Sequence, residues 1–215
     1  MLCCGRLLFM FSDRTDAGTK LANELRLGTY TVQLVIGLAR GGAVIARAIS
    51  DALGIPTDIL VVKKIGSPVN TELAIGALAP DGVSYLNDRL ARQTGADTAY
   101  ITSQISRLTG EIKQKTRFYR SGMPPVDIHG KTVILTDDGI ATGATMIAAI
   151  RWAQYKRAKT ILVAVPVAPP DVVTALRALV RTVVVLETKT DFGAVGEFYT
   201  RFPQLTDADV VKLLT

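Results

Sequence analysis

Short apolar runs rich in β-branched residues alternate with segments of helical periodicity along this chain, and this alternation limits the folds open to it. It is typical of βαβ units, in which helices join parallel strands. The sequence therefore predicts an α/β fold with a central, mainly parallel sheet flanked by helices. Strands are expected at residues 32–38, 57–62, 132–137, 160–167 and 182–187, and helices at residues 16–27, 43–53, 97–120, 143–157, 170–180 and from 206 onward.

The middle of the chain departs from this pattern. The strings LAIGAL and VSYL flank the turn PDG at residues 80–82 and predict an antiparallel hairpin. The long helix at residues 97–120 has one apolar stripe, formed by Ile101, Ile105, Leu108 and Ile112. We expect this helix to cover the core; the alternative is a wall over the ligand site or a dimer contact.

Size and composition describe an ordinary folded protein. The chain has 215 residues, of which 48% are hydrophobic and 20% charged, and we expect one domain. No apolar run approaches the roughly 20 residues that cross a bilayer, and the apolar patch from Leu7 to Phe11 is too short for a signal peptide. Cys3 and Cys4 are adjacent, which excludes a disulfide scaffold or a CxxC metal site and suits a reducing compartment. We therefore expect a cytoplasmic protein without a membrane segment.

The charge balance fits a phosphorylated ligand. The chain carries 25 basic and 19 acidic residues, for a net charge of +6. Basic residues are scattered except on the long helix, and no helix-turn-helix or ribonucleoprotein motif is present. The exception is the group Lys113, Lys115, Arg117 and Arg120. We expect no nucleic-acid partner, because a small phosphorylated molecule accounts for the charge equally well.

The stretch VILTDDGIATGAT, residues 133–145, ends a buried strand in two adjacent carboxylates and continues into a loop of small residues. In an open parallel sheet, ligands collect beyond the carboxyl ends of the strands, where a following helix offers unpaired N–H groups to an anion. Small side chains let the backbone wrap a phosphate, and threonine hydroxyls add donors. We interpret this loop as a phosphate cradle formed by Ala141, Thr142, Gly143, Ala144 and Thr145.

The two carboxylates, Asp137 and Asp138, need a different partner, because they would repel a phosphate. Vicinal ribose hydroxyls fit, since each can donate a charge-assisted hydrogen bond. We predict that the pair holds a ribose and stabilises positive charge at its C1 during transfer. One alternative is a helix cap with a solvated acid. Another is a phosphatase of the haloacid-dehalogenase type, which needs an Asp-x-Asp spacing that adjacent acids do not have.

A second motif, GLARGG, follows the strand at residues 32–38. Its arginine and glycines place a fixed cation and close-approaching backbone N–H groups at the same sheet edge, which suits a second phosphate. The residues are Ala39, Arg40, Gly41 and Gly42. A turn with a surface arginine is the alternative, and a dinucleotide site fits worse because the GxGxxG spacing is missing.

Two lysines, Lys63 and Lys64, follow the strand at residues 57–62. Lysines at a strand end are often simply solvated. The sequel IGSPVN contains glycine, proline and asparagine and is typical of a mobile loop.

These strings resemble the type I phosphoribosyltransferases. VILTDDGIATGAT is similar to their thirteen-residue motif for phosphoribosyl pyrophosphate (PRPP): a hydrophobic strand, two acids and a TG loop. The strings SDRTDAG, GLARGG, VVKKIGSPVNTELAIGA and FGAVGEFY extend the similarity from about Phe11 to the C-terminus and resemble a subgroup whose acceptor is unassigned. The resemblance implies transfer of ribose 5-phosphate from PRPP to a nitrogenous, aromatic base, with Mg²⁺ bound mainly through PRPP and the released pyrophosphate.

The resemblance also implies residue roles. Asp137, Asp138 and Lys64 would be catalytic, and residues 39–42 would form the pyrophosphate loop, where the family often has a cis peptide. Lys63 would bind pyrophosphate with Lys64, and the loop after them would close over the reacting centre.

The resemblance further implies a single domain at residues 1–215. Its core would comprise about residues 28–80 and 130–187, and its hood about residues 11–27, 84–125 and 188–215. A homodimer is left open.

The acceptor base is not indicated. Hypoxanthine-guanine enzymes have an aspartate where this chain has Ala141, whereas adenine, uracil and orotate enzymes tend to have alanine. A non-catalytic PRPP or nucleotide sensor with the same fold is the second hypothesis. Phe192, Phe198 and Tyr199 either stack the base or belong to the core. We expect His129 at the surface and Trp152 and Tyr155 in packing roles; these three complete the candidates.

Overall fold

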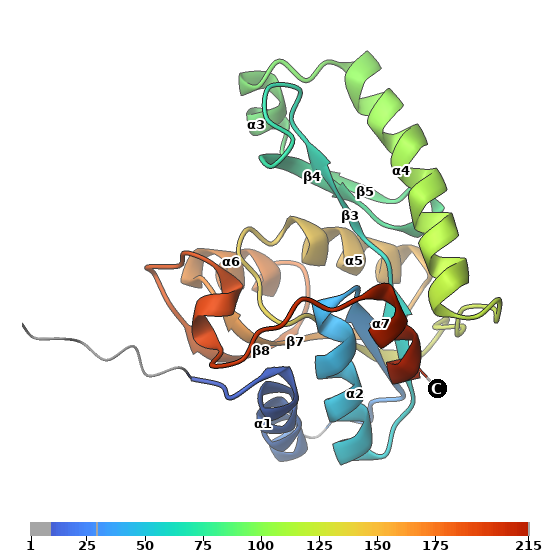
Figure 1. The fold of residues 1–215 in the computed structure, drawn as a ribbon. Coiled ribbons are helices and arrows are strands. Elements are labelled where there is room, and N and C mark those ends of the chain that lie inside the picture. Colours follow the sequence, from blue (N-terminus) through green and yellow to red (C-terminus); the bar gives the residue numbers. More distant parts are fainter. Residues whose placement is uncertain (1–9, 29, 215) are drawn as a thin grey trace, which may run out of the picture.

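A five-stranded parallel sheet forms the centre of the protein (Figure 1). The computed structural model describes residues 10–28 and 30–214, so Cys3 and Cys4 lie outside the described residues. The strand order is β2-β1-β6-β7-β8. The strands are β1 (Leu34–Leu38), β2 (Thr57–Leu60), β6 (Thr132–Thr136), β7 (Thr160–Ala168) and β8 (Thr182–Thr188). The predicted fold class and all five predicted parallel strands are thereby confirmed.

Helices cover both faces of this sheet. One face carries α1 (Arg14–Leu27) and α2 (Gly41–Leu53), and the other carries α5 (Ala144–Tyr155) and α6 (Pro170–Arg177). Alternate residues of a strand point to opposite faces of the sheet and join a different apolar core on each face. Val35 packs with α1 and α2, whereas Leu34 and Ile36 pack with α5 and α6. Strands buried on both faces explain the continuous apolar runs in the sequence.

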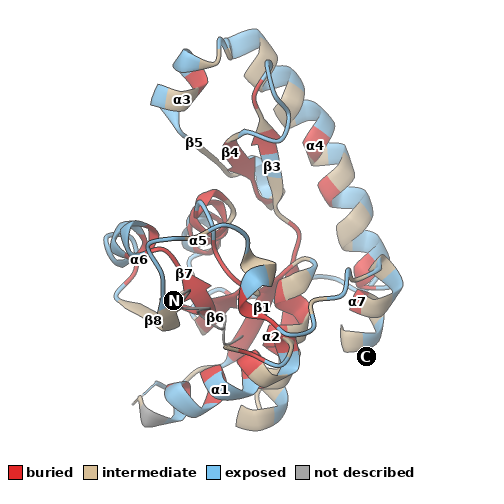
Figure 2. Cartoon of the chain, turned by 60° about the vertical axis from the view of Figure 1, so that its left-hand side comes forward, coloured by how far each residue is buried: buried red, intermediate tan, exposed pale blue. Residues whose placement is uncertain are grey.

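A separate lobe rises from the end of β2 (Figure 1). It contains an antiparallel sheet in the order β3-β4-β5 and two helices. The elements are β3 (Lys63–Gly66), β4 (Ala74–Leu78), the 3₁₀ turn η1 (Pro80–Gly82), β5 (Ser84–Leu86), α3 (Asp88–Gln93) and α4 (Thr98–Tyr119). Figure 2 shows fewer buried residues here than in the five-stranded sheet and its helices, which we call the body. We call residues 63–119 the lobe.

A third apolar cluster holds the lobe together and continues into the body at Ile59 of β2 and Val210 near the C-terminus. Ile65 and Ile75 of the sheet are fully buried together with Leu108 and Ile112, two members of the stripe predicted on the long helix. The helix begins where Asp97 accepts a hydrogen bond from the Tyr100 N–H, a regular N-terminal cap. The stripe thus covers the core of the lobe.

The C-terminal segment ties lobe and body together. After the 3₁₀ turn η2 (Val195–Phe198), the chain crosses the body to α7 (Asp207–Leu214). This last helix packs against α2 of the body and α4 of the lobe, and its Val210 is fully buried. Within the described residues, no helix is long and apolar enough to cross a membrane.

Two predictions about the middle of the chain were incomplete. Residues 63–66 form β3, so the expected hairpin is part of a three-stranded sheet. Helix α3 was not predicted, although Asn87 caps it by accepting from the Leu90 N–H. β3 and β4 belong to a sheet separate from the central one, and α1 packs against one face of the central sheet.

Candidate active site

Two loops meet at the carboxyl ends of neighbouring strands. β1 and β6 pair directly, with Gly37 opposite Thr136, and each continues into a loop followed by a helix. A Cβ atom added to Gly41 would lie 1.8 Å from Oδ2 of Asp138, and one added to Gly42 would lie 2.7 Å from the carbonyl oxygen of Thr136. The predicted carboxylates and the predicted pyrophosphate loop are therefore in contact, at a separation that only glycine allows.

Asp137 is held by backbone donors. Its Oδ1 accepts a hydrogen bond of 2.9 Å from the Asp138 N–H, and the Gly42 N–H also donates to it. Burial raises the pKa of Asp137 well above its ordinary value of 3.8, and the neighbouring charge of Asp138 raises it further. No cation contacts this carboxylate directly among the described residues, so its ionised form is costly without a ligand.

Asp138 has a cationic partner that sequence reasoning missed. Nε of Arg14 donates to Oδ2 of Asp138 at 2.7 Å, and another guanidinium nitrogen donates to the carbonyl oxygen of Pro203. The guanidinium also lies 3.6 Å from the ring centroid of Phe202. Burial raises the pKa of Asp138, and Arg14 opposes that rise. The string SDRTDAG contained the only signal for this residue, and it carried no assigned role.

The distal aromatic residues lie beneath this pair. The Tyr199 hydroxyl donates to the carbonyl oxygen of Asp138 at 2.5 Å, and its ring packs against Phe11 and Phe202. Tyr199 and Phe198 are buried in the body core, and Phe192 packs against Phe198. The core alternative is therefore the correct one for Phe198 and Tyr199, since their ring faces are covered by protein.

The predicted phosphate cradle leads into the first turn of α5. Ala141 and Thr142 are exposed, and Gly143 has φ of +78°, a backbone conformation that favours glycine. No side chain caps this helix, so the N–H groups at Ala144 and Thr145 are left for a ligand or solvent. The cradle lies in the same loop as the two carboxylates and opens on the same edge of the sheet.

Comparison with known proteins identifies the family. The model of the phosphoribosyl transferase domain matches residues 12–200. The chain belongs to the phosphoribosyl transferase domain family. Its fold is the type I phosphoribosyltransferase fold, as predicted.

Three relatives illustrate the match. "Putative phosphoribosyl transferase Rv0571c" of Mycobacterium tuberculosis is 38% identical over 205 residues, covering 95% of this chain but 46% of that protein, so the chain spans about half the length of this relative. A ribose-phosphate pyrophosphokinase of Sulfurisphaera tokodaii is 39% identical over 103 residues, 47% of this chain and 31% of that protein. The crystal structure of TT1426 from Thermus thermophilus has a TM-score of 0.80 at 37% identity and covers 95% of this chain and 97% of that chain.

In this phosphoribosyl transferase domain the predicted pyrophosphate residues have different surroundings. The peptide between Ala39 and Arg40 is cis. The Arg40 guanidinium lies 3.8 Å from Asp207 of α7, and the Lys63 ammonium donates to Glu111 of α4 at 2.9 Å. Lys64 is exposed and has no hydrogen bond or ion pair with any residue that the structure describes.

Asp207 is a second residue that sequence reasoning missed. Besides Arg40, its carboxylate accepts from the Tyr119 hydroxyl at 2.7 Å and from the Lys115 ammonium at 3.2 Å. These donors, with the Tyr119 hydroxyl first, lower the pKa of Asp207. Burial, and then the hydrogen bond to Asp207, raise the pKa of Tyr119. Asp207 therefore connects the loop after β1 with the lobe helix α4.

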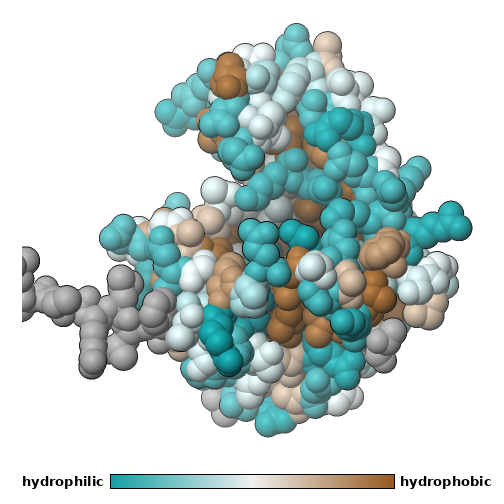
Figure 3. Space-filling view, in the orientation of Figure 1, coloured by the Kyte–Doolittle hydropathy of each residue, from teal (hydrophilic) through white to brown (hydrophobic). Residues whose placement is uncertain are grey.

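The expected roles of His129 at the surface and Trp152 in packing are confirmed, whereas the packing role expected for Tyr155 is wrong, because 62% of this residue is exposed. His129 is exposed next to a turn, and Tyr155 is exposed at the end of α5. Trp152 is buried and donates from Nε1 to Asp81. The space-filling view shows the molecule hollowed between lobe and body (Figure 3), which leaves room for a ligand between them.

Proposed function

We propose that this protein transfers ribose 5-phosphate from PRPP to a nitrogenous, aromatic base. The bond between C1 of the ribose and the pyrophosphate oxygen breaks, and pyrophosphate leaves with the electron pair. A nitrogen lone pair of the base forms the new bond to C1, and the proton of that nitrogen passes to pyrophosphate or solvent. The contact of the Asp137–Asp138 pair with Gly41 and Gly42 is the observation that favours this function most.

That contact matches the layout of PRPP, in which the diol lies between a phosphate on C5 and pyrophosphate on C1. The acids stand between the α5 cradle on one side and the residues 39–42 loop on the other. Asp137 and Asp138 would accept hydrogen bonds from the two ribose hydroxyls. Their negative charge would also stabilise the oxocarbenium-like transition state, because they are half-buried and oriented before the substrate arrives.

The cradle would bind the 5-phosphate. The uncapped first turn of α5 offers backbone N–H groups, and the positive end of the helix dipole favours an anion there. The hydroxyls of Thr142 and Thr145 would add donors. This anchor lies away from the reacting C1, so its binding energy serves to position the sugar.

Arg40, Gly41 and the two lysines would bind pyrophosphate. Lys64 supports this best, since it is exposed and unpaired within the described part of the chain. Arg40 and Lys63 would exchange their ion pairs with Asp207 and Glu111, in whole or part, for the phosphate oxygens. Lys63 and Lys64 belong to β3 of the lobe, so bringing them onto the leaving group would draw the lobe toward the body.

Magnesium fits this site as a partner of the substrate. No group of three or more His, Cys, Asp or Glu side chains gathers among the described residues, whereas Mg²⁺ commonly binds through one or two carboxylates and substrate phosphates. Asp137 and Asp138 are the hard oxygen ligands that would hold it with PRPP. Bound there, the ion would neutralise charge on the departing pyrophosphate.

A screen of acceptors tests the proposal. The purified protein is incubated with Mg²⁺, PRPP and a panel of purine and pyrimidine bases, and pyrophosphate release is followed. Release that depends on one base supports the transferase. Calorimetry with PRPP alone separates binding from turnover, and absence of both PRPP binding and turnover would reject the function.

A non-catalytic PRPP or nucleotide sensor is the second candidate. The loop at residues 139–145 contains no titratable side chain that could serve as a general base toward the acceptor. A sensor would bind PRPP in the calorimeter and release no pyrophosphate with any base of the panel. Turnover with one base would exclude it.

A further inference from the structure

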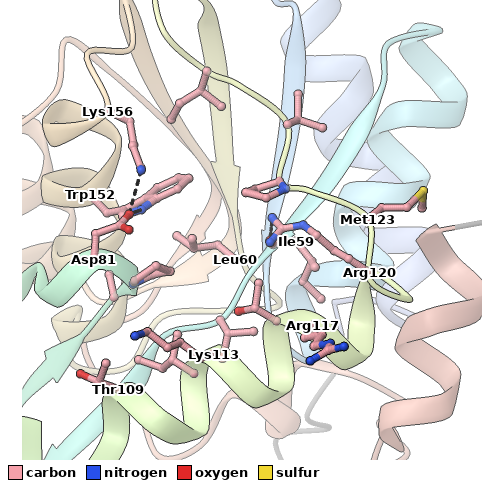
Figure 4. A pocket seen from close by; sticks show the side chains of 18 of the residues that line it. Ile59, Leu60, Asp81, Thr109, Lys113, Arg117, Arg120, Met123, Trp152 and Lys156 are labelled. Atoms are coloured by element: carbon pink, nitrogen blue, oxygen red, sulfur yellow. Dashed lines mark hydrogen bonds and ion pairs between the residues drawn. The ribbon is translucent and has the colours of Figure 1, made fainter. Parts of the chain in front are cut away.

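A cavity lies between lobe and body, apart from the candidate site (Figure 4). Its volume is about 900 Å³, within the range of small-molecule sites. Its walls are α4, the η1 turn, the end of β2, the last turn of α5 and the loop at residues 122–128. It shares no lining residue with the two loops of the candidate active site.

One wall of the cavity is apolar. It includes Leu60 and Ile128 from the body core, together with Ile112 of the lobe. Trp152 also lines it, held by its hydrogen bond to Asp81. A hydrated inorganic ion would leave this surface without a partner, whereas a flat organic ring would cover it.

The polar wall has a net positive charge. Four basic residues line the cavity against two acidic ones, Asp81 and Asp127. Two of the basic residues are already paired, Arg120 with Asp58 and Lys156 with Asp81. The other two, Lys113 and Arg117, have no hydrogen bond or ion pair from their side chains within residues 10–28 and 30–214. They stand one turn apart on α4, and an anionic group bound in the cavity would draw both side chains toward it.

A hydroxyl between them also lacks a partner. Oγ1 of Thr116 is buried without a hydrogen bond, and Thr116 lines the same cavity. A buried donor without a partner is costly, and a ligand oxygen would relieve that cost once the hydroxyl turns toward the cavity. Among the described residues, the only other buried side-chain oxygen or nitrogen without a hydrogen-bond partner is Oγ1 of Thr136 in the central sheet.

We propose that this cavity is a second binding site, for a planar aromatic anion. The negative group, a phosphate, carboxylate or sulfonate, binds Lys113, Arg117 and the Thr116 hydroxyl, and the ring covers the apolar wall beside Trp152. Because the walls come from both lobe and body, the occupant contacts both. The site does not depend on PRPP chemistry, so it stands or falls separately from the proposed function.

Binding at this site can be followed by intrinsic fluorescence, because Trp152 is the only tryptophan of the chain. The probe is 1-anilinonaphthalene-8-sulfonate, an aromatic anion, and its neutral analogue N-phenyl-1-naphthylamine serves as comparison. Titration of the full chain is expected to change Trp152 fluorescence with a stoichiometry of one. The anion is expected to bind at least about tenfold more tightly than the neutral compound, which corresponds to about 1.4 kcal/mol.

Charge removal provides the decisive variants. Lys113→Ala with Arg117→Ala is expected to weaken binding of the anion at least about tenfold and to leave the neutral analogue unaffected. Arg89→Ala with Arg92→Ala removes the same charge from exposed positions on α3 whose side chains have no ion pair with any described residue, and it is expected to change neither affinity. All four side chains are exposed, so folding is not at risk, and circular dichroism verifies it. Equal binding of both compounds, or equal affinities in the two double variants, would overturn the site.

Discussion

The body and the lobe are built on different principles. In the body, β1 is buried along its whole length because helices cover both faces of the sheet. In the lobe, β5 is only half-buried, and one cluster centred on Ile65 and Leu108 holds the antiparallel sheet to α4. The proposed ribose and phosphate residues all lie on the body, whereas Lys63 and Lys64 lie on the lobe. Such a division suits a rigid platform for the sugar and a second part that can approach the leaving group.

The largest expected effect follows from charge removal on the body. Asp137→Asn with Asp138→Asn is expected to lower PRPP affinity at least about 100-fold, because two charge-assisted hydrogen bonds to the ribose are lost. Calorimetry measures the loss, and the circular dichroism spectrum is expected to stay unchanged. Asp137→Asn alone is expected to keep or raise the melting temperature, because it removes a buried charge without a direct cation partner. Undiminished PRPP binding by the double variant would refute the ribose assignment.

Core truncations separate the two regions by stability. Leu135→Ala in the central sheet and Ile65→Ala in the lobe each remove a fully buried side chain and are expected to cost about 2–5 kcal/mol locally. The body variant is expected to lower the free energy of global unfolding in urea. The lobe variant is expected to accelerate hydrogen exchange in β3, β4 and α4 while β1 and β6 stay protected. Uniform acceleration throughout the chain would show that body and lobe unfold as one unit.

The same contrast governs what the sequence could predict. The strands of the body can be predicted from their apolar runs. The end of α2 can be predicted from Gly54, whose φ of +67° favours glycine. In the lobe, Lys63 and Lys64 open a strand whose outward faces are polar, so the pattern resembled a loop. The cap at Asn87 was a local signal for α3, but six residues carry little periodicity.

Partners within the site could not be predicted in the same way. The positions of Asp137 and Gly41 follow from strand ends and glycine, which are local properties. The Arg14–Asp138 ion pair joins residues 124 positions apart, and the Tyr119–Asp207 hydrogen bond joins residues 88 apart. Only the packing of distant segments reveals such pairs, because neither side chain has a distinctive neighbourhood along the chain.

A smaller effect is expected where α7 joins body and lobe. Asp207→Asn weakens the acceptor of Tyr119, Lys115 and Arg40 and is expected to cost about 1 kcal/mol of stability. Hydrogen exchange at the C-terminal end of α4 is expected to accelerate. Glu24→Gln, an exposed position on α1, is the matched control. Identical exchange in both variants would show that α7 holds the lobe through apolar contacts alone.

The smallest expected effect is a dependence on pH. Its direction differs between the folding stability of the free protein and its affinity for PRPP. Burial raises the folded-state pKa of Asp137 and Asp138 above 3.8, so the folded chain binds more protons than the unfolded chain. The stabilisation that comes from this extra proton binding is complete below pH 3.8. It is lost as the pH rises through the raised folded-state pKa values of the two aspartates. PRPP affinity is expected to run the opposite way, since ribose hydroxyls need ionised acceptors, with at most about a tenfold change per pH unit for each proton. Melting temperatures and calorimetry across this pH range measure both slopes, and Asp137→Asn with Asp138→Asn should flatten the stability slope. If the wild-type stability slope persists in that variant, the titrating groups lie elsewhere in the molecule.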